Sequence, residues 1–214
     1  PAMVRRRVAE VVALEPDLIL VPGDVLDQPP ERLAWLPDAL ADLRAPLGVF
    51  ATTGNHEYYV GVDASVDLLE RAGFDVLMNE HVELPVGIVV AGIEDRTADR
   101  FDRARPSEAE ILADADTRRP VLFLNHTPAA DEVQAAVAAG ADLVHSGHTH
   151  GGQIWPVGLL TRLAFPYHHG LYRVGSGHQL TTSGIGWWGP SMRLGVPPEI
   201  VLVTLRAEPA PTRP

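Results

Sequence analysis

The chain has 214 residues, a length that suits a single domain with a sizeable hydrophobic core. Its formal net charge of −11 argues against non-specific binding to nucleic acid, so we expect no nucleic-acid partner. The sequence has no cysteine, which excludes disulfides and thiolate metal sites. No apolar run approaches the length of a membrane-spanning helix, so the chain itself is expected to be soluble.

Up to Gly152, the apolar pattern predicts helices that alternate with short buried strands, which indicates a mixed α/β fold. In chain order we expect a helix over 4–14, a strand over 17–21, a helix over 31–43, a strand over 48–52, a helix over 64–72, strands over 74–78 and, in two pieces, over 82–93, a helix over 107–115, a strand over 121–124, a helix over 130–139 and a strand over 143–144. After Gly152 the pattern predicts strands without helices, over 171–174, 179–182 and 200–205. One domain is expected over 1–206, followed by a disordered tail over 207–214.

Four short polar blocks each follow a predicted strand and lie at a glycine-bounded turn. A sheet delivers the side chains at its strand ends to one edge, so we expect these blocks to lie close together. They are Gly23-Asp24, Gly54-Asn55-His56-Glu57, Asn125-His126 and Gly147-His148-Thr149-His150.

The side chains of these blocks form a metal-ligand set. A carboxylate, an amide oxygen and neutral imidazoles suit Mn²⁺, Fe or Zn²⁺ better than Ca²⁺, which prefers oxygen ligands. Two such ions about 3.5–4 Å apart can hold both oxygens of a phosphoryl displacement, and Asp24 is the natural bridging carboxylate. His148 and His150 alternate along a segment that we expect to be extended, so both rings can face one site. The candidate ligands are Asp24, Asn55, His126, His148 and His150.

Two further histidines have different expected roles, which follow from their positions in the sequence. His56 directly follows Asn55 and is the candidate general acid, which would protonate a leaving alkoxide. His145 lies inside a predicted strand, so we expect it in the core. A lone Gly-Asp is more often a turn, and a lone Asn-His is more often a structural histidine, whereas His-x-His is moderately specific on its own. All four in order, each after a strand, predict a metal site.

Together these blocks resemble the calcineurin-like metallophosphoesterase superfamily. The matching motifs are Gly-Asp-x-x-Asp at 23–27, Gly-Asn-His-Glu at 54–57, the lone His126 and Gly-His-x-His at 147–150. The stretches 146–153 and 193–200 are similar to the YkuE- and YaeI-like phosphodiesterase branch, and the similarity covers residues 4–206.

The resemblance implies a four-layer α/β/β/α sandwich with metals at the strand ends. It implies that Asp24 bridges two divalent ions, that Asn55, His126 and His148 complete one of them and that His150 serves the other. His56 would be the acid, and a metal-bound hydroxide would attack the phosphorus in line. The substrate would be a phosphoester, with a diester favoured.

One family block is missing, because residues 1–3 contain neither Asp nor His where the family carries Asp-x-His. We therefore expect an N-terminally truncated domain that lacks its first strand and holds one metal well. Its activity would then be weak or absent. The resemblance also suggests that a longer parent protein is membrane-associated or exported.

Two alternatives differ in class from the leading hypothesis of a phosphodiesterase. A catalytically dead metal-binding or scaffold domain is favoured if the first block is truly absent. An amidohydrolase also uses His-x-His, but that motif would lie near the start of a barrel, whereas here it lies at 148–150. Neither the oligomeric state nor the substrate follows from the sequence. An apolar cluster after the His-x-His block leaves contact with lipid open: Leu159, Leu160, Leu163, Phe165, Trp187 and Trp188.

Overall fold

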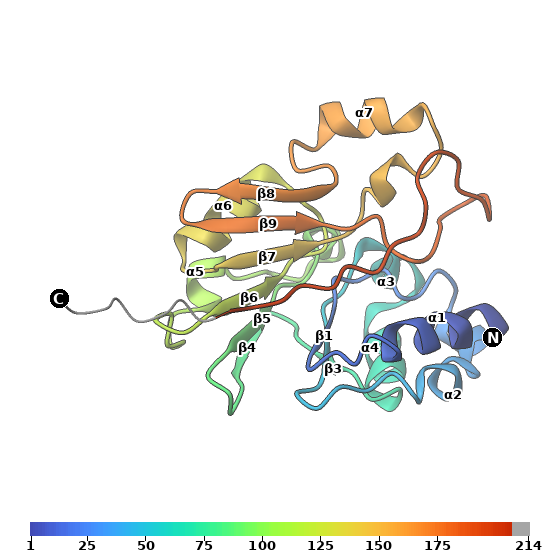
Figure 1. The fold of residues 1–214 in the computed structure, drawn as a ribbon, viewed down its shortest axis with the longest axis horizontal. Coiled ribbons are helices and arrows are strands. Elements are labelled where there is room, and N and C mark those ends of the chain that lie inside the picture. Colours follow the sequence, from blue (N-terminus) through green and yellow to red (C-terminus); the bar gives the residue numbers. More distant parts are fainter. Residues whose placement is uncertain (207–214) are drawn as a thin grey trace.

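The computed structural model describes residues 1–206, and the tail expected over 207–214 lies outside the described residues. Figure 1 shows two β-sheets side by side, with helices arranged around them.

The first sheet is formed by the N-terminal part of the chain. Its three strands run parallel in the order β1-β2-β3, with Leu20 opposite Phe50 and Phe50 opposite Asp75. One core cluster joins this sheet to helices α1, α2 and α4. The strands are β1 (Ile19–Val21), β2 (Val49–Ala51) and β3 (Asp75–Val76), and the helices are α1 (Ala2–Val12), α2 (Leu36–Leu40) and α4 (Val62–Arg71).

The second sheet has six strands in the order β4-β5-β6-β7-β9-β8. Its four central strands are parallel, and the two outer strands run antiparallel to their neighbours. A second core cluster packs α5 and α6 against one face. The elements are β4 (Glu80–Glu83), β5 (Val89–Gly92), α5 (Glu108–Ile111), β6 (Val121–Leu124), α6 (Ala130–Ala138), β7 (Leu143–Ser146), β8 (Gly170–Val174) and β9 (Gly177–Thr181).

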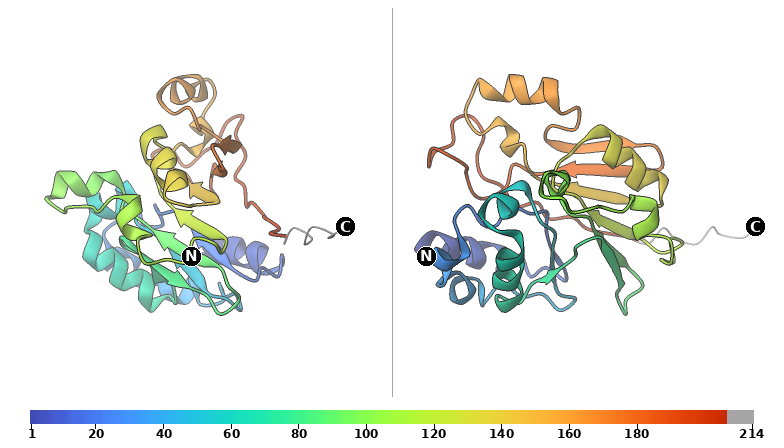
Figure 2. Two further views of the ribbon diagram at one scale, coloured as in Figure 1. Left: turned by 90° about the vertical axis from the view of Figure 1, so that its left-hand side faces the viewer. Right: turned by 180° about the vertical axis from the view of Figure 1, so that it is seen from behind.

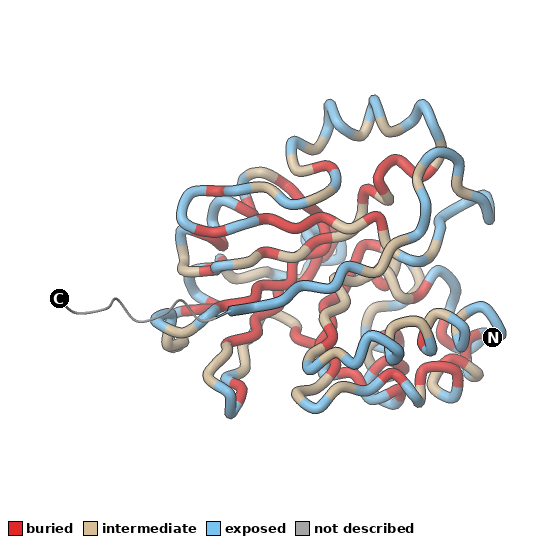
Figure 3. Tube along the Cα trace, viewed as in Figure 1, coloured by how far each residue is buried: buried red, intermediate tan, exposed pale blue. Residues whose placement is uncertain are grey.

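The two sheets share a core of apolar side chains between them. Phe50 of the first sheet lies in one buried cluster with Val90 and Leu124 of the second. Gly92 permits the close approach, because a Cβ at this position would lie 2.7 Å from the Leu77 Cβ. Figure 3 shows the buried residues concentrated along the central strands of the second sheet. The helix, sheet, sheet, helix order matches the four expected layers.

Two predicted helices are shorter than expected. Over 31–43 the structure has a 3₁₀ turn, η1 (Pro30–Leu33), followed by α2. Each segment carries a proline in its first turn, which suits a helix start but cannot donate a hydrogen bond inside one continuous helix. The helix expected over 107–115 ends at Ile111. Its Ser107 cap is confirmed, because Ser107 Oγ accepts from the Glu110 N–H.

The segment after Gly152 differs most from expectation. A helix, α7 (Val157–Ala164), stands where only strands were predicted, and it begins directly after Pro156. The strand predicted over 200–205 is wrong for the described chain: residues 201–206 belong to no strand and are exposed. At the same time β1 pairs through one edge only, with β2. None of the helices formed by residues 1–206 is both long and apolar enough to cross a membrane.

Candidate metal centre

The carboxyl ends of four parallel strands deliver the predicted blocks to one place. β1 leads to Asp24, β2 leads to the start of α3 (Asn55–Val60), β6 leads to His126 and β7 leads to His148. Two of these strands belong to each sheet, so the site lies where the two sheets meet.

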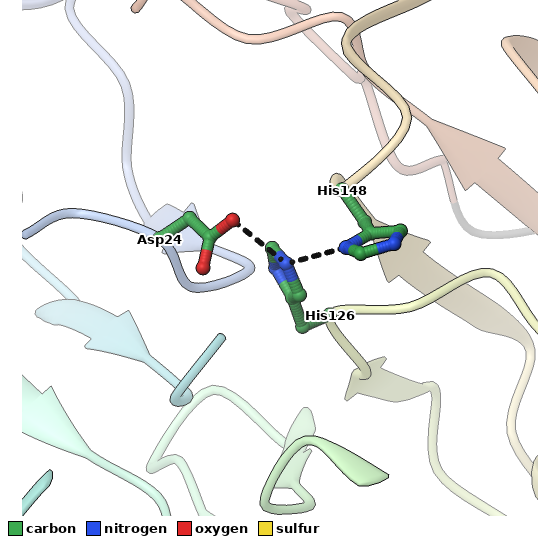
Figure 4. Close-up of side chains that lie close together, drawn as sticks. All are labelled: Asp24, His126 and His148. Carbon is green, nitrogen blue, oxygen red and sulfur yellow. Dashed lines mark hydrogen bonds and ion pairs between the residues drawn. The ribbon is translucent and has the colours of Figure 1, made fainter. Parts of the chain in front are cut away.

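Four of the five predicted ligands lie in direct contact, and Figure 4 shows three of them, Asp24, His126 and His148. Ligand atoms of Asp24, His126 and His148 all lie within 4.8 Å of one another. His126 Nε2 is 3.0 Å from Asp24 Oδ2 and 3.2 Å from His148 Nδ1. The Asn55 Oδ1 atom completes the group, at 2.8 Å from His148 Nδ1 and 3.2 Å from His126 Nε2.

The hydrogen bonding of His126 leaves one ring nitrogen for the centre. Its Nδ1 lies 2.6 Å from the Pro22 carbonyl oxygen, which can only accept, so Nδ1–H donates to it. A neutral ring then points the lone pair of Nε2 towards Asp24, Asn55 and His148. Oxygen and nitrogen acceptors thus converge on one point, where a divalent cation satisfies all of them. The donor set fits a metal ion.

The ionisation of the group is shifted by burial and by mutual charge. Burial alone would raise the pKa of Asp24, but the charge and hydrogen bond of His126 hold it well below its usual range. Burial alone would lower the pKa of His126, yet Asp24 and the buried Asp95 raise it. Burial, reinforced by the charge on His126, lowers the pKa of His148 to about 4. Without a metal, the Asp24 carboxylate instead attracts the protonated, positively charged ring of His126.

Strained backbone marks the same positions. Asp24, His148 and His150 have φ values of 54°, 63° and 50°, in the left-handed region that non-glycine residues seldom occupy. Gly54 lets the Asp24 loop approach α3, because a Cβ here would lie 2.2 Å from Asp24 Oδ1. The surrounding structure therefore imposes the positions of these side chains.

Glu57 joins the first two blocks. Its carboxylate is fully buried and accepts hydrogen bonds from three backbone N–H groups, those of Asp24 at 3.0 Å, Leu26 at 2.9 Å and Gly54 at 2.8 Å. Burial raises the pKa of the Glu57 carboxyl, and the charge of Asp24 raises it further. The fourth letter of the Gly-Asn-His-Glu motif is thus a positioning residue.

His56 lies at the rim of the centre. Its backbone N–H donates to Asp24 Oδ1 at 2.9 Å, while its Nδ1 lies 2.7 Å from Asp27 Oδ1. The side chain keeps 23 % of its surface exposed, so the ring can meet a molecule from solvent. Since Asp27 takes Nδ1–H, the other ring nitrogen is free to hold or release a proton.

His150 departs from expectation. It begins a 3₁₀ turn, η3 (His150–Gly152), so the predicted extended segment is wrong. Thr149 caps this turn and donates from Oγ1 to the His168 carbonyl oxygen at 2.7 Å. Among residues 1–206, His150 does not join the close ligand group, and its buried Nδ1 has no hydrogen-bond partner. Burial, together with the charge of Arg193, lowers the pKa of His150 to about 4.

Three carboxylates that contact the site residues had no role assigned to them from the sequence. Glu57 and Asp27 lie within the motifs, so their positions were visible although their partners were not. Asp95 is buried, accepts from Thr127 Oγ1 at 2.6 Å and helps to raise the pKa of His126. Its signal was the one shared by the other blocks, a polar residue just after a buried strand. His145 lies in β7 as expected, away from the ligand group.

An α/β sandwich with converging metal ligands at its strand ends defines the class of protein. Residues 3–152 match the calcineurin-like phosphoesterase family, and the chain belongs to that family. This membership places it among the phosphoric ester hydrolases that use divalent metal ions.

Individual relatives agree with this assignment. An uncharacterised metallophosphoesterase of Aquifex aeolicus is 40 % identical over 91 % of this chain and 74 % of its own length. The Bacillus subtilis metallophosphoesterase YkuE is 30 % identical over 90 % of this chain and 69 % of its own length, so the expected branch is confirmed. A Danio rerio transmembrane protein with a metallophosphoesterase domain is 33 % identical over 94 % of this chain and 48 % of its own length.

A crystal structure of a Thermus thermophilus protein shares the fold. Its TM-score is 0.56 at 13 % identity, and the match covers 84 % of this chain and 82 % of that one. The chain spans about half the length of several curated relatives, including proteins of Campylobacter jejuni and Helicobacter pylori.

Proposed function

We propose that residues 1–206 form the catalytic domain of a metal-dependent phosphodiesterase. The observation that carries this proposal is the convergence of Asp24, Asn55, His126 and His148 on one point with their acceptor atoms facing each other. These four residues would hold one divalent ion, and Asp24 together with His150 would serve a second one. Mn²⁺, Fe and Zn²⁺ are the candidate metals, because the ligand set mixes oxygen and imidazole nitrogen.

The chain's own residues supply the rest of the chemistry. A bound divalent ion supplies a Lewis acid that polarises a phosphoryl oxygen and lowers the pKa of a coordinated water. His56 holds a proton for the leaving alkoxide, and Asp27 orients its ring through a 2.7 Å contact with Nδ1. The buried His126 keeps the Asp24 carboxylate ionised, and Asp95 in turn raises the pKa of His126.

Only one ion has a near-complete ligand set among the described residues, so we expect one tightly held equivalent per chain. Elemental analysis after desalting measures this number, and two tightly held equivalents would contradict the assignment. Hydrolysis of bis(p-nitrophenyl) phosphate with Mn²⁺, Fe²⁺ or Zn²⁺ added back tests the activity.

The variants Asp24→Ala and His56→Ala should abolish hydrolysis, whereas the exposed His178→Ala serves as the matched control and should not. Metal binding without any hydrolysis in the wild-type chain would favour a non-catalytic metal-binding domain, the alternative class. Membrane association of the whole protein is supported by the Danio rerio relative, which is named as a transmembrane protein. We extend the substrate class to lipid-linked phosphoesters on the same ground.

A further inference from the structure

The helix α7 presents large apolar side chains to solvent. None of its eight residues is buried, and Leu160 and Leu163 keep 67 % and 84 % of their surface exposed. Trp155, just before the helix, keeps 68 %. Figure 1 shows α7 standing off the body above β8, and Figure 2 shows the same separation from two further sides. A helix with this much exposed apolar surface indicates an interaction site.

The stretch of sequence that contains α7 differs in charge from the rest of the chain. Between Asp142 and Glu199 the sequence contains no Asp or Glu, and its charged residues are Arg162, Arg173 and Arg193. The whole chain has 28 acidic residues against 17 basic ones, so all the negative charge lies outside this stretch. Arg193 donates to backbone carbonyl oxygens of the neighbouring loops, whereas Arg162 and Arg173 are exposed. The stretch therefore presents positive charge without a carboxylate on a strongly negative protein, which is complementary to an anionic surface.

A second apolar group lies beside the segment that leads into α7. Gln153 holds the loop that carries Trp188, because its side chain accepts from the Trp188 N–H at 2.9 Å and donates to the Trp188 carbonyl oxygen at 2.9 Å. The Trp155 N–H in turn donates to the Leu194 carbonyl oxygen at 2.8 Å. Tryptophan, leucine and arginine together are the composition of membrane-interface segments.

The helix is also attached to the candidate metal centre. Gly152 and Gly158 touch so closely that a Cβ on Gly152 would lie 2.2 Å from the Gly158 Cα, which fixes the start of α7 on η3. At its other end, the Phe165 ring packs edge-on against His148, with ring centroids 5.3 Å apart. A molecule that α7 contacts therefore lies next to the ligand group.

We propose that α7 and Trp155 form a docking surface for an anionic lipid bilayer, with Leu159, Leu160 and Leu163 in the acyl region and Arg162 at the headgroups. The helix lies in the interface rather than across it, since eight residues span far less than a bilayer. The proposal goes beyond the proposed hydrolysis and does not depend on it. It would bring a phosphoester at a membrane surface to the metal centre.

Vesicle flotation in the presence of EDTA tests the proposal independently of metal and catalysis. We expect the wild-type chain to bind phosphatidylcholine vesicles that contain phosphatidylglycerol and to bind pure phosphatidylcholine vesicles several-fold more weakly. Raising the salt concentration should weaken the binding, and tryptophan fluorescence should shift to the blue on binding. The double variant Leu160→Glu with Leu163→Glu should reduce the binding at least about tenfold.

The matched control is the double variant Leu14→Glu with Val86→Glu, which adds the same charge at exposed apolar positions outside the surface. It should bind like the wild type, and circular dichroism should show both variants folded. The absence of wild-type binding to the anionic vesicles, or an equal loss in the control, would overturn the proposal. So would a dimer that the α7 variant disrupts without any vesicle binding, because that result assigns α7 to a second copy. Hydrolysis of the soluble diester should be unchanged in the α7 variant.

Discussion

Glu57 Oε2 accepts a hydrogen bond from the backbone N–H of Asp24 at 3.0 Å, although 33 residues separate the two in the sequence. The same atom accepts from the N–H of Gly54, so one carboxylate oxygen ties the two metal-binding loops together. The geometry of the centre therefore depends on a residue that is not itself in the ligand group.

Glu57→Gln should destabilise the fold and weaken metal binding. The amide keeps one acceptor oxygen, but its NH₂ group then faces backbone donors, which costs about 2–3 kcal/mol in the free energy of unfolding. Urea denaturation and metal titration measure the two effects. Glu70→Gln, at an exposed position of α4, is the control and should change neither quantity. Unchanged metal affinity in Glu57→Gln would show that the loops hold their positions without this carboxylate.

Gly54→Ala should reduce metal affinity while leaving the overall fold almost unchanged. The new methyl group would lie 2.6 Å from the Asp24 backbone nitrogen, so the Asp24 loop must move away from α3. We expect a loss of at least about tenfold in metal affinity, because ligand positions must be kept within a few tenths of an ångström. Isothermal titration with Mn²⁺ measures it. Gly186→Ala, where an added Cβ meets no atom within 4 Å, should bind as the wild type does.

Asp27→Asn should slow hydrolysis while leaving the metal content intact. The Asp27 carboxylate orients the His56 ring through a 2.7 Å contact but lies outside the ligand group. General acid catalysis contributes about 10²–10⁴-fold, so removing the orienting charge should cost part of that factor and His56→Asn more of it. Steady-state kinetics measure the rate of hydrolysis, and parallel elemental analysis measures the metal content. Metal loss in Asp27→Asn would assign the carboxylate to the metal instead.

His145 should make the metal-free fold acid-sensitive. Burial lowers the pKa of His145 to about 4 in the folded chain, against 6.5 for the ordinary residue. Above pH 6.5 both states are neutral and the contribution to stability is complete. As the pH falls from 6.5 towards 4, the unfolded state gains a proton that the folded state does not, so up to about 3 kcal/mol of stability is lost.

The comparison of wild type with His145→Asn isolates this contribution, because the other histidines titrate in both proteins. Urea denaturation with EDTA at about pH 7.5, 5.5 and 4.5 provides the measurement. The stability gap between the two proteins should shrink as the pH falls, and a gap independent of pH would contradict the buried neutral state.

The convergence of four of the predicted ligands could be anticipated from the sequence because it depends on local information. Gly23-Asp24 and Asn125-His126 follow buried strands, and parallel strands carry such residues to one edge whatever the details of packing. The partners of Glu57 and Asp27 were not predictable, since these contacts join loops about thirty residues apart and depend on tertiary approach. The prediction of an extended backbone at His150 was wrong for a related reason. A left-handed φ value at a non-glycine residue is imposed by its tertiary surroundings, which no local sequence pattern reveals.

The region after Gly152 was predicted least well. The apolar residues of α7 do recur at helical spacing, but the helix has only eight residues. A run this short is difficult to tell from a strand by periodicity alone. The alternating stretch 200–205 has the pattern of a strand, but a strand needs a hydrogen-bonding neighbour, and among residues 1–206 this segment has none.

That extended stretch has a consequence for the handling of the protein. Val201, Leu202, Val203 and Leu205 are exposed on a segment that contains no proline, and β1 offers an open edge to any passing strand. A free β-rich segment and a free sheet edge on the same molecule template pairing between molecules, which is the route to fibrillar aggregates. Glu199 and Arg206 flank the stretch as charged gatekeepers. Neutralising either of these two charges should therefore promote aggregation at high protein concentration.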